Sequence, residues 1–319
     1  MINEPKTYFY FPMCNNDFNQ RAIDITKNAS TIFVQKLTKL QEGISLEQLI
    51  KPVEEIINTY IRTGQYPQGM KQFIEGNGYQ QTLFRFLKEA GSGREIKVVL
   101  ERTAIDPQQQ HNAETEKFNA EGQFFLNVPE AGKQAMIQYL QKWDNYFRTQ
   151  EENVTQQIMA FNQPLVAILG YPRHLAIPEI VKKQKPIEIF YATPNYPQSY
   201  DHQMIQEFRK NGTYSDELYF RRMIEFMVME VLKSNIPPEK NVYTRFIPTA
   251  HYYARSLTQG GMNVVRAIPL MESENLWSSW PALNRAFERE GLMSLETALE
   301  TENIEEIYPT TVQSKLTYA

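Results

Sequence analysis

The sequence predicts an α/β protein with a Rossmann-like, mostly parallel sheet in its C-terminal half and a helix-rich α/β portion before it. Two observations predict this class. Apolar residues make up 42% of the 319-residue chain and charged residues 22%, which is a globular composition. In the C-terminal half, β-prone runs alternate with amphipathic runs, which is typical of a parallel sheet covered by helices on both faces.

The length of the chain is compatible with two domains or with one large domain. A long polar helix is expected to continue through 148–160, so we place a soft boundary near 150–162. This boundary predicts a helix-rich α/β region over 1–155 and a Rossmann-like β/α-alternating region over 156–319, or else one continuous domain.

The N-terminal region is expected to begin with a strand over 7–13, because its residues are aromatic and β-prone. Apolar residues at steps of three and four then predict one helix over 18–40. Ser45 and Gln48 have the spacing of a capping box, which predicts a second helix over 46–61. The other expected elements are a helix over 82–90, a strand over 95–101, a polar loop over 106–122, a short strand over 123–128 and a helix from Pro129.

The C-terminal half is expected to contain four strands with helices between and after them. The expected strands cover 164–170, 187–192, 241–247 and 263–268, and the expected helices cover 176–183, 218–232, 251–258, 280–290 and 295–302. Ligands of open parallel sheets bind beyond the carboxyl ends of the strands. The residues that follow these four strands are therefore the candidate site.

Polar and aromatic side chains follow each predicted strand. Arginine can hold phosphate or carboxylate groups in a bidentate manner, histidine titrates near neutral pH, and tyrosine can stack on a base or a sugar. The predicted catalytic residues are His174, His251 and Glu272. The predicted substrate-binding residues are Arg173, Asn195, Tyr196, Tyr252 and Arg255.

Composition and motifs argue against several classes of protein. The net charge is −4 and no long basic run appears, which argues against nucleic-acid binding. One cysteine, Cys14, allows no intramolecular disulfide, and four histidines with one cysteine argue against a metal site. There is no P-loop, nucleophile elbow or zincin motif. No secretory leader or apolar run of about 20 residues is visible, so we expect a cytoplasmic protein.

A glycine-rich segment, Gly76-Asn77-Gly78, precedes the helix expected over 82–90. Flexible backbone before a helix can hold an anion, although two glycines also simply make a turn.

Residues 71–82 resemble part of the Fic family motif, H-x-F-x-D/E-G-N-G-R-x-x-R. Phe73, Glu75 and the Gly-Asn-Gly segment match it, whereas Lys71 stands at the catalytic histidine and both arginines are replaced. In that family the histidine is the base that activates the target hydroxyl. We therefore interpret the match as a coincidence or as a degenerate relative without that chemistry.

The C-terminal segment is acidic and ends in a polar tail over 309–319. Its glutamates are Glu296, Glu300, Glu302, Glu305 and Glu306. A solvated helix face is one explanation. The pattern also resembles the acidic C-terminal signal of bacterial type IV secretion effectors, which implies translocation by such a machine.

Three hypotheses of function follow from these features. The first is a transferase-like enzyme that binds a nucleotide-containing or other small anionic donor at the loops after the strands. The second is a non-enzymatic interaction protein or secreted bacterial effector with a protein partner. The third is a small-molecule hydrolase or lyase that uses the same pocket. The sequence leaves the cofactor, the substrate and the oligomeric state open.

Overall fold

The structure is a computed structural model that describes residues 6–12, 20–35, 38–39, 43–65, 78–126, 129–170, 176–191, 199–235, 246–259 and 280–300. The chain forms two compact units. Unit 1 comprises residues 1–113 and 143–194, and unit 2 comprises residues 114–142 and 195–319. The chain therefore leaves unit 1 and returns to it before it enters unit 2 for the second time. The proposed division at residue 155 stays a prediction.

Unit 1 is built on a five-stranded sheet in which every strand is parallel to its neighbours. The strands, in sheet order, are β4 (Lys97–Leu100), β2 (Thr31–Val34), β6 (Leu165–Ile168), β1 (Thr7–Phe11) and β7 (Ile187–Tyr191). Val166 of the central strand β6 pairs with Tyr8 on one side and with Ile32 on the other. All four residues of β6 are buried. The predicted α/β class and the parallel sheet are confirmed.

Three of the five strands come from residues 7–100, so a sheet confined to the C-terminal half is not confirmed. The strand order also differs from that of dinucleotide-binding sheets, in which the first strand lies between the second and the fourth. Here the fourth sheet strand along the chain, β6, lies between the first and the second, β1 and β2. A Rossmann-like topology is therefore not confirmed.

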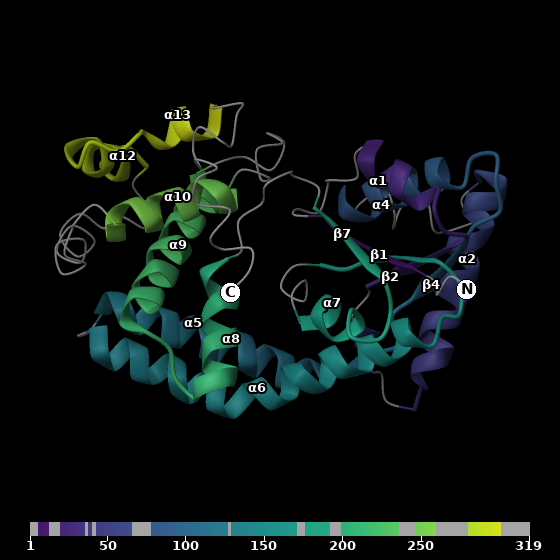
Figure 1. Ribbon diagram of the computed structural model, residues 1–319, viewed down its shortest axis with the longest axis horizontal. Helices are drawn as coiled ribbons and strands as arrows, with labels where there is room; N and C mark the ends of the chain where they lie inside the picture. The colour runs from purple at the N-terminus through teal and green to yellow at the C-terminus, as the bar shows by residue number, and fades with distance from the viewer. Residues whose placement is uncertain are drawn as a thin grey trace. The chain divides into compact units, whose positions relative to one another are not determined.

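Helices cover both faces of this sheet (Figure 1). Helices α1 (Gln20–Thr26) and α4 (Gly78–Ala90) lie on one face, and α2 (Leu46–Thr63) packs against α4 and β4. Helix α7 (Ala176–Val181) lies on the opposite face. The chain steps toward one edge of the sheet from β1 to β2 and β4, and toward the other edge from β6 to β7. Right-handed crossovers in opposite directions place their helices on opposite faces.

The helix predicted over 18–40 is wrong beyond residue 26. Helix α1 ends at Thr26, and the chain then forms the strand β2 and the short strand β3 (Thr38–Lys39), which pairs with β5 (Ala104–Ile105). All four residues of β2 are buried. A strand that is buried on both faces has a continuous apolar run, which periodicity alone does not distinguish from part of a helix.

The loop predicted over 106–122 and the strand predicted over 123–128 are also wrong, because α5 spans Pro107–Leu126. Asp106 caps this helix: its Oδ1 accepts hydrogen bonds from the backbone N–H of Gln108 at 2.8 Å and of Gln109 at 3.3 Å. Proline suits the first helical position that follows such a cap. Most residues of α5 are polar, so the sequence shows no clear apolar period of a helix there. Helix α6 (Pro129–Met159) follows as predicted.

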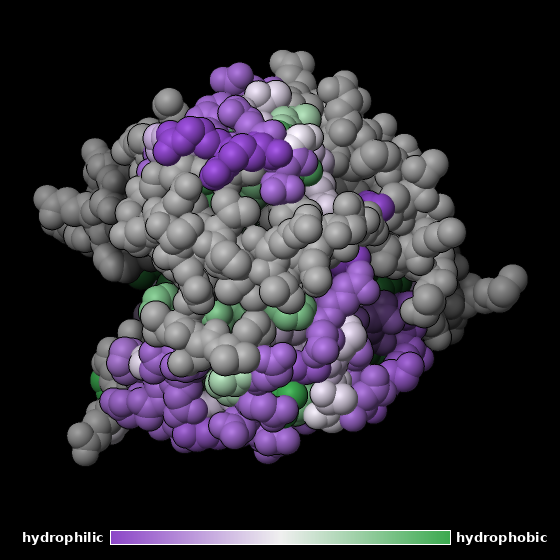
Figure 2. Space-filling model, turned by 90° about the vertical axis from the view of Figure 1, so that its left-hand side faces the viewer, coloured by the Kyte–Doolittle hydropathy of each residue, from purple (hydrophilic) through white to green (hydrophobic). Residues whose placement is uncertain are grey.

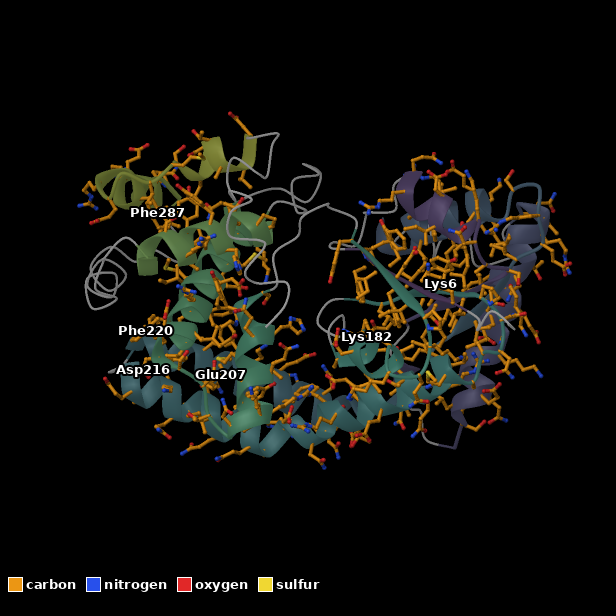
Figure 3. The ribbon with its side chains drawn as sticks, in the orientation of Figure 1. Lys6, Lys182, Glu207, Asp216, Phe220 and Phe287 are labelled. Carbon is orange, nitrogen blue, oxygen red and sulfur yellow. The ribbon has the colours of Figure 1, made fainter. Side chains whose placement is uncertain are left out.

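The described residues of unit 2 outside α5 and α6 are also helical. They form α8 (Tyr200–Asn211), α9 (Asp216–Asn235), α10 (Phe246–Gln259), α12 (Trp280–Arg289) and α13 (Leu295–Glu300). Helix α9 contacts α8, α10 and α12. The ring of Phe287 on α12 stacks on that of Tyr253 on α10, with centroids 4.0 Å apart (Figure 3). No helix among the described residues is long and apolar enough to cross a membrane.

The strand predicted over 241–247 is wrong at its last two residues, which begin α10. Residues 241–245 and the strand predicted over 263–268 lie outside the described residues. Pro248 lies in the first turn of α10, where no intrahelical N–H bond is required. Ala250, Tyr253 and Ala254 are buried at helical spacing and provide the apolar face of this helix.

The outer edge of β4 is closed by side chains of α2. The amide of Asn58 donates from Nδ2 to the Val98 carbonyl at 3.0 Å, and its Oδ1 accepts the Val98 N–H at 2.9 Å. Glu54 Oε1 accepts the Leu100 N–H at 2.5 Å. These side chains occupy the positions of a next strand, so this edge cannot pair with another chain.

We expect Asn58→Ala to lower the free energy of unfolding by about 2 kcal/mol, because it leaves the N–H and C=O of Val98 without partners. Urea unfolding followed by circular dichroism measures the loss. The matched control is Asn145→Ala at an exposed position of α6, where a change within about 0.5 kcal/mol is expected. Equal losses in the two variants would contradict this role for Asn58.

Candidate functional site

The carboxyl ends of the five parallel strands lie along one edge of the sheet. After two of the strands, β1 and β6, which are adjacent, the chain continues in opposite directions across the sheet. After β1 the chain steps toward β2, and after β6 it steps toward β7. Such a reversal is a topological switch point, at which open α/β sheets bind ligands. The segments that follow the two strands are 13–19 and 171–175, and both lie outside the described residues.

Five of the predicted site residues lie outside the described residues. They are Arg173 and His174 after β6, Asn195 and Tyr196 after β7, and Glu272. By chain connectivity, the first four follow strands that end at the carboxyl edge of the sheet. Their roles stay predictions.

A hydrogen-bonded bridge fixes the carboxyl ends of β2 and β6 next to the switch point. The N–H of Gln35 donates to the Ile168 carbonyl at 2.9 Å, and its Oε1 accepts the N–H of Gly170 at 2.5 Å. A Cβ at Gly170 would lie 3.2 Å from this oxygen, which is closer than side chains normally pack. These contacts fix the position of Gly170 next to the carboxyl end of β2.

Unit 2 contains a buried cluster of charged side chains around Arg222 of α9. The guanidinium donates from Nε to Asp201 Oδ1 at 3.2 Å and from Nη2 to Glu121, and its Nη1 lies 3.9 Å from Glu225 Oε2. All four residues are buried. Lys117 Nζ adds an ion pair to Asp201 Oδ2 at 2.9 Å. The cluster joins α5, α8 and α9.

The charges in this cluster stabilise one another against the cost of burial. Burial alone would raise the pKa of Asp201, but Lys117 and Arg222 outweigh it and hold this pKa well below its usual range. Burial opposes the charge of Arg222, but Glu121, Asp201 and Glu225 outweigh this effect and raise its pKa. Both groups therefore stay ionised inside the helical unit.

Glu225 links the cluster to the N-terminus of α8 and to α10. Its Oε1 accepts the N–H of Tyr200 at 3.3 Å, and its Oε2 accepts the hydroxyl of Ser199 at 3.3 Å. Ser199 caps α8, since its Oγ accepts the N–H of Asp201 at 3.1 Å. Glu225 Oε1 also lies 3.2 Å from His251 Nδ1. A carboxylate is favourable at this end of a helix.

His251 is held within this packing. Its ring is 1% exposed and stacks on that of Tyr200, with centroids 3.8 Å apart and planes at 5°. Burial lowers the pKa of His251 from its usual 6.5, against the opposing effect of Glu225, and the nearby charges of Arg221 and Arg255 lower it as well. The imidazole is therefore neutral at pH 7, with its Nδ1 proton donated to Glu225.

The structure brings three of the predicted site residues together on α10: His251, Tyr252 and Arg255. All three lie in the stretch 251–258 that was predicted to be helical, but α10 already begins at Phe246, inside the strand that was predicted to precede them. Tyr252 and Arg255 are half-buried, and the ring of Tyr252 lies edge-on to that of Tyr253, with centroids 5.0 Å apart. Their proposed roles in substrate binding and catalysis stay predictions.

The sequence analysis did not identify the residues at the centre of the cluster. A signal for two of them is present in α9, where Arg222 and Glu225 share a buried stretch with Met223, Ile224 and Phe226. Charged residues at buried positions are paired or bound to a ligand. For Glu121 and Asp201, on other helices, the sequence offers no comparable signal.

No group of three or more histidine, cysteine or acidic side chains in the described ranges is arranged to bind a metal ion. Comparisons with protein-family models, curated proteins and solved structures found no match.

We expect Arg222→Met to destabilise the protein by about 3–5 kcal/mol, because it leaves buried carboxylates without their shared cation. Chemical denaturation measures the loss. The matched control is Lys233→Met on the same helix, where an exposed pair with Glu230 is lost and a change below about 1 kcal/mol is expected. A small loss for Arg222→Met would show that the cluster does not stabilise unit 2.

The lowered pKa of His251 makes stability depend on pH. As the pH falls below 6.5, the unfolded chain binds a proton before the folded protein does, so stability falls by up to about 1.4 kcal/mol per pH unit until the folded pKa is reached. Asp201 acts in a separate window: its stabilisation is lost as the pH falls below 3.8.

Unfolding curves between pH 7.5 and about 5 test the contribution of His251. His251→Phe keeps a ring against Tyr200 but cannot titrate, so the variant should lose part of the pH dependence. His111→Gln, at an exposed position of α5, is the control and should keep all of it. An unchanged pH dependence in His251→Phe would contradict this assignment.

Proposed function

We propose that the chain is a transferase-like enzyme that binds a nucleotide-containing or other small anionic donor at the carboxyl edge of the sheet of unit 1. One observation carries this proposal. The connections that follow the adjacent parallel strands β1 and β6 run toward opposite edges of the sheet. In open α/β sheets this position opens a crevice that backbone and side chains from two loops can line. In this proposal the sheet binds its ligand as Rossmann-like sheets do, beyond the carboxyl ends of its strands.

The residues that follow the strands suit an anionic ligand. Arg173 and His174 follow β6 at the switch point, and Asn195 and Tyr196 follow β7 at the same edge. In this proposal Arg173 pairs with phosphate or carboxylate, and His174 is the general base. Asn195 binds polar groups of the donor, and Tyr196 stacks on its base or sugar.

A second feature supports anion binding at this edge. Helix α4 leads through the short segment 91–96 into the start of β4, so the helix runs against the strand direction and begins toward the carboxyl edge. Its first residue, Gly78, is the last residue of the Gly-Asn-Gly segment. Backbone N–H groups at such a helix start are donors for phosphate.

The candidate residues on and after α10 in unit 2 form a separate part of the proposal and are not placed at this edge of the sheet. We propose His251 and Glu272 as further candidates for acid–base catalysis, and Tyr252 and Arg255 as further substrate-binding residues. The expected cytoplasmic location and the translocation signal also remain proposals. Of the glutamates that suggested this signal, Glu296 and Glu300 lie in α13, and the rest lie outside the described residues.

The interaction-protein alternative has less support from the described surface. The large apolar side chains that are exposed in the described ranges are Ile44 at 41% and Phe118 at 61%. On the face shown in Figure 2, the described residues are mostly hydrophilic, with smaller apolar patches between them. Broad apolar surfaces usually mark a protein-binding site. A hydrolase or lyase would use the same edge of the sheet but would catalyse a different reaction, because a hydrolase passes the group to water and a lyase cleaves its substrate by elimination.

A thermal-shift panel of nucleotides, nucleotide sugars, S-adenosylmethionine and acyl-CoA tests the proposal. A ligand of the right class at 100 times its Kd should stabilise the protein by about 2.7 kcal/mol. Arg173→Ala should weaken its binding by about tenfold or more, because a charged hydrogen bond is lost. Lys183→Ala is the matched control: it removes one exposed positive charge from the segment that enters β7 at the opposite edge, and binding should not change.

Two results would contradict the proposal. One is the absence of stabilisation by every compound of the panel. The other is a ligand whose binding is weakened equally by Arg173→Ala and Lys183→Ala, since that would indicate a general effect of charge. Turnover of a bound compound by water alone would identify the hydrolase alternative.

A further inference from the structure

The outer edge of β7 carries backbone groups that have no partner among the described residues. The N–H of Thr7 donates to the carbonyl of Pro186 at 3.0 Å, so the backbone of Pro186 faces β1. In a parallel ladder the residues that face the neighbour alternate with those that face away. Glu188 and Phe190 therefore bond to β1, and the N–H and C=O groups of Ile187 and Ile189 point outward. No described residue pairs with these groups.

Among the described residues, none of the devices that protect sheet edges in native proteins is found at β7. At the other end of the sheet, Asn58 and Glu54 close the outer edge of β4. The charged side chain on β7, that of Glu188, forms an ion pair with Lys6, which directly precedes β1. Lys185, which precedes β7, donates to the carbonyls of residues 159 and 161 at 2.8 and 2.5 Å. An apolar edge without free charges or a covering element is a site for strand pairing.

We propose that β7 pairs with β7 of a second copy of this chain, antiparallel and across a two-fold axis, so that the two sheets become one. With Ile189 on the axis, Ile187 lies opposite Tyr191 of the second copy, and Glu188 lies opposite its Phe190. Ile189 lies opposite itself, and the outward N–H and C=O groups of the two copies bond each other directly. This proposal does not rest on the proposed function.

The charges on the α1 face make a second copy the matching occupant. Arg21 of α1 lies over the Phe190 ring at 5.5 Å, and no carboxylate among the described residues pairs with it. Antiparallel pairing places Glu188 opposite Phe190 of the second copy and therefore beside its Arg21. Glu188 can contact this Arg21 through Oε2 while its Oε1 stays paired with Lys6. The two-fold axis repeats this contact, and no like charges lie directly opposite each other. An unrelated extended peptide could make the backbone bonds but not this pair of ionic contacts.

The face of β7 that points away from α1 carries apolar and aromatic side chains, namely those of Ile187, Ile189 and Tyr191. Ile189 would contact its own copy, and Ile187 would contact Tyr191. Aliphatic and aromatic pairs of this kind stabilise antiparallel strands. Because β7 is only five residues long, the contact area is small. We therefore expect a concentration-dependent dimer.

Cysteine cross-linking tests the register. In a Cys14→Ser background, Ile189→Cys should form an intermolecular disulfide under mild oxidation, because residues directly opposite each other are about 5.5 Å apart at Cα. Glu188→Cys is the matched control. Two residues at position 188 would be diagonal neighbours, beyond the reach of a disulfide, so no cross-link should form.

Sedimentation velocity over a range of concentrations tests the assembly itself. The unsubstituted chain should change from monomer to dimer, and Ile189→Lys should raise the dimer dissociation constant by about tenfold or more, since charge on an edge opposes pairing. Arg21→Gln should weaken the dimer without changing the fold of the monomer, because Arg21 is exposed on α1. Circular dichroism confirms that each variant is folded.

Three outcomes would overturn the proposal. They are a chain that stays monomeric at every concentration, a dimer that persists in folded Ile189→Lys, and equal cross-linking at positions 188 and 189. Binding of ligands to the monomer would leave the proposed function intact in each case.

Discussion

The fold of unit 1 depends on the insertion of β6 between β1 and β2. Without this strand the sheet would fall into the pairs β4-β2 and β1-β7, and isolated two-stranded pairs are marginally stable. The chain reaches β6 only after it has formed α5 and α6, whose middle portion belongs to unit 2. The sheet is therefore completed by a contact between residues far apart in sequence, and the same insertion creates the switch point between β6 and β1.

The sequence predicted the elements whose signals are local. Strands β1, β4, β6 and β7 were predicted within a few residues, as were the helices α2, α6 and α9, because caps and periodicity mark them. Strand β2 was missed because burial on both faces gives it the same apolar run as a helix. Helix α5 was missed because its exposed polar residues resemble a loop. The pairing order was beyond prediction, since it depends on long-range contacts.

The candidate site divides in the same way. The rule that places ligands at the carboxyl ends of strands selected Arg173 and His174 from the sequence, and the topology adds a switch point there. The cluster around Arg222 depends on three helices, α5, α8 and α9, that the sequence does not bring together. Its members alternate in charge, so each offsets the burial cost of its neighbours. The structure links His251 to this cluster, which makes the stability of unit 2 the first property that its substitution would change.

The two outer edges of the sheet have opposite characters, and this has a consequence for the proposed site. Antiparallel pairing of β7 points the carboxyl ends of the two copies in opposite directions, so each copy would keep its own switch point. Strand β6, after which the segment of Arg173 and His174 begins, would be separated from the axis by β1 and β7. The site and the interface would share only one strand, which is why they can be tested separately.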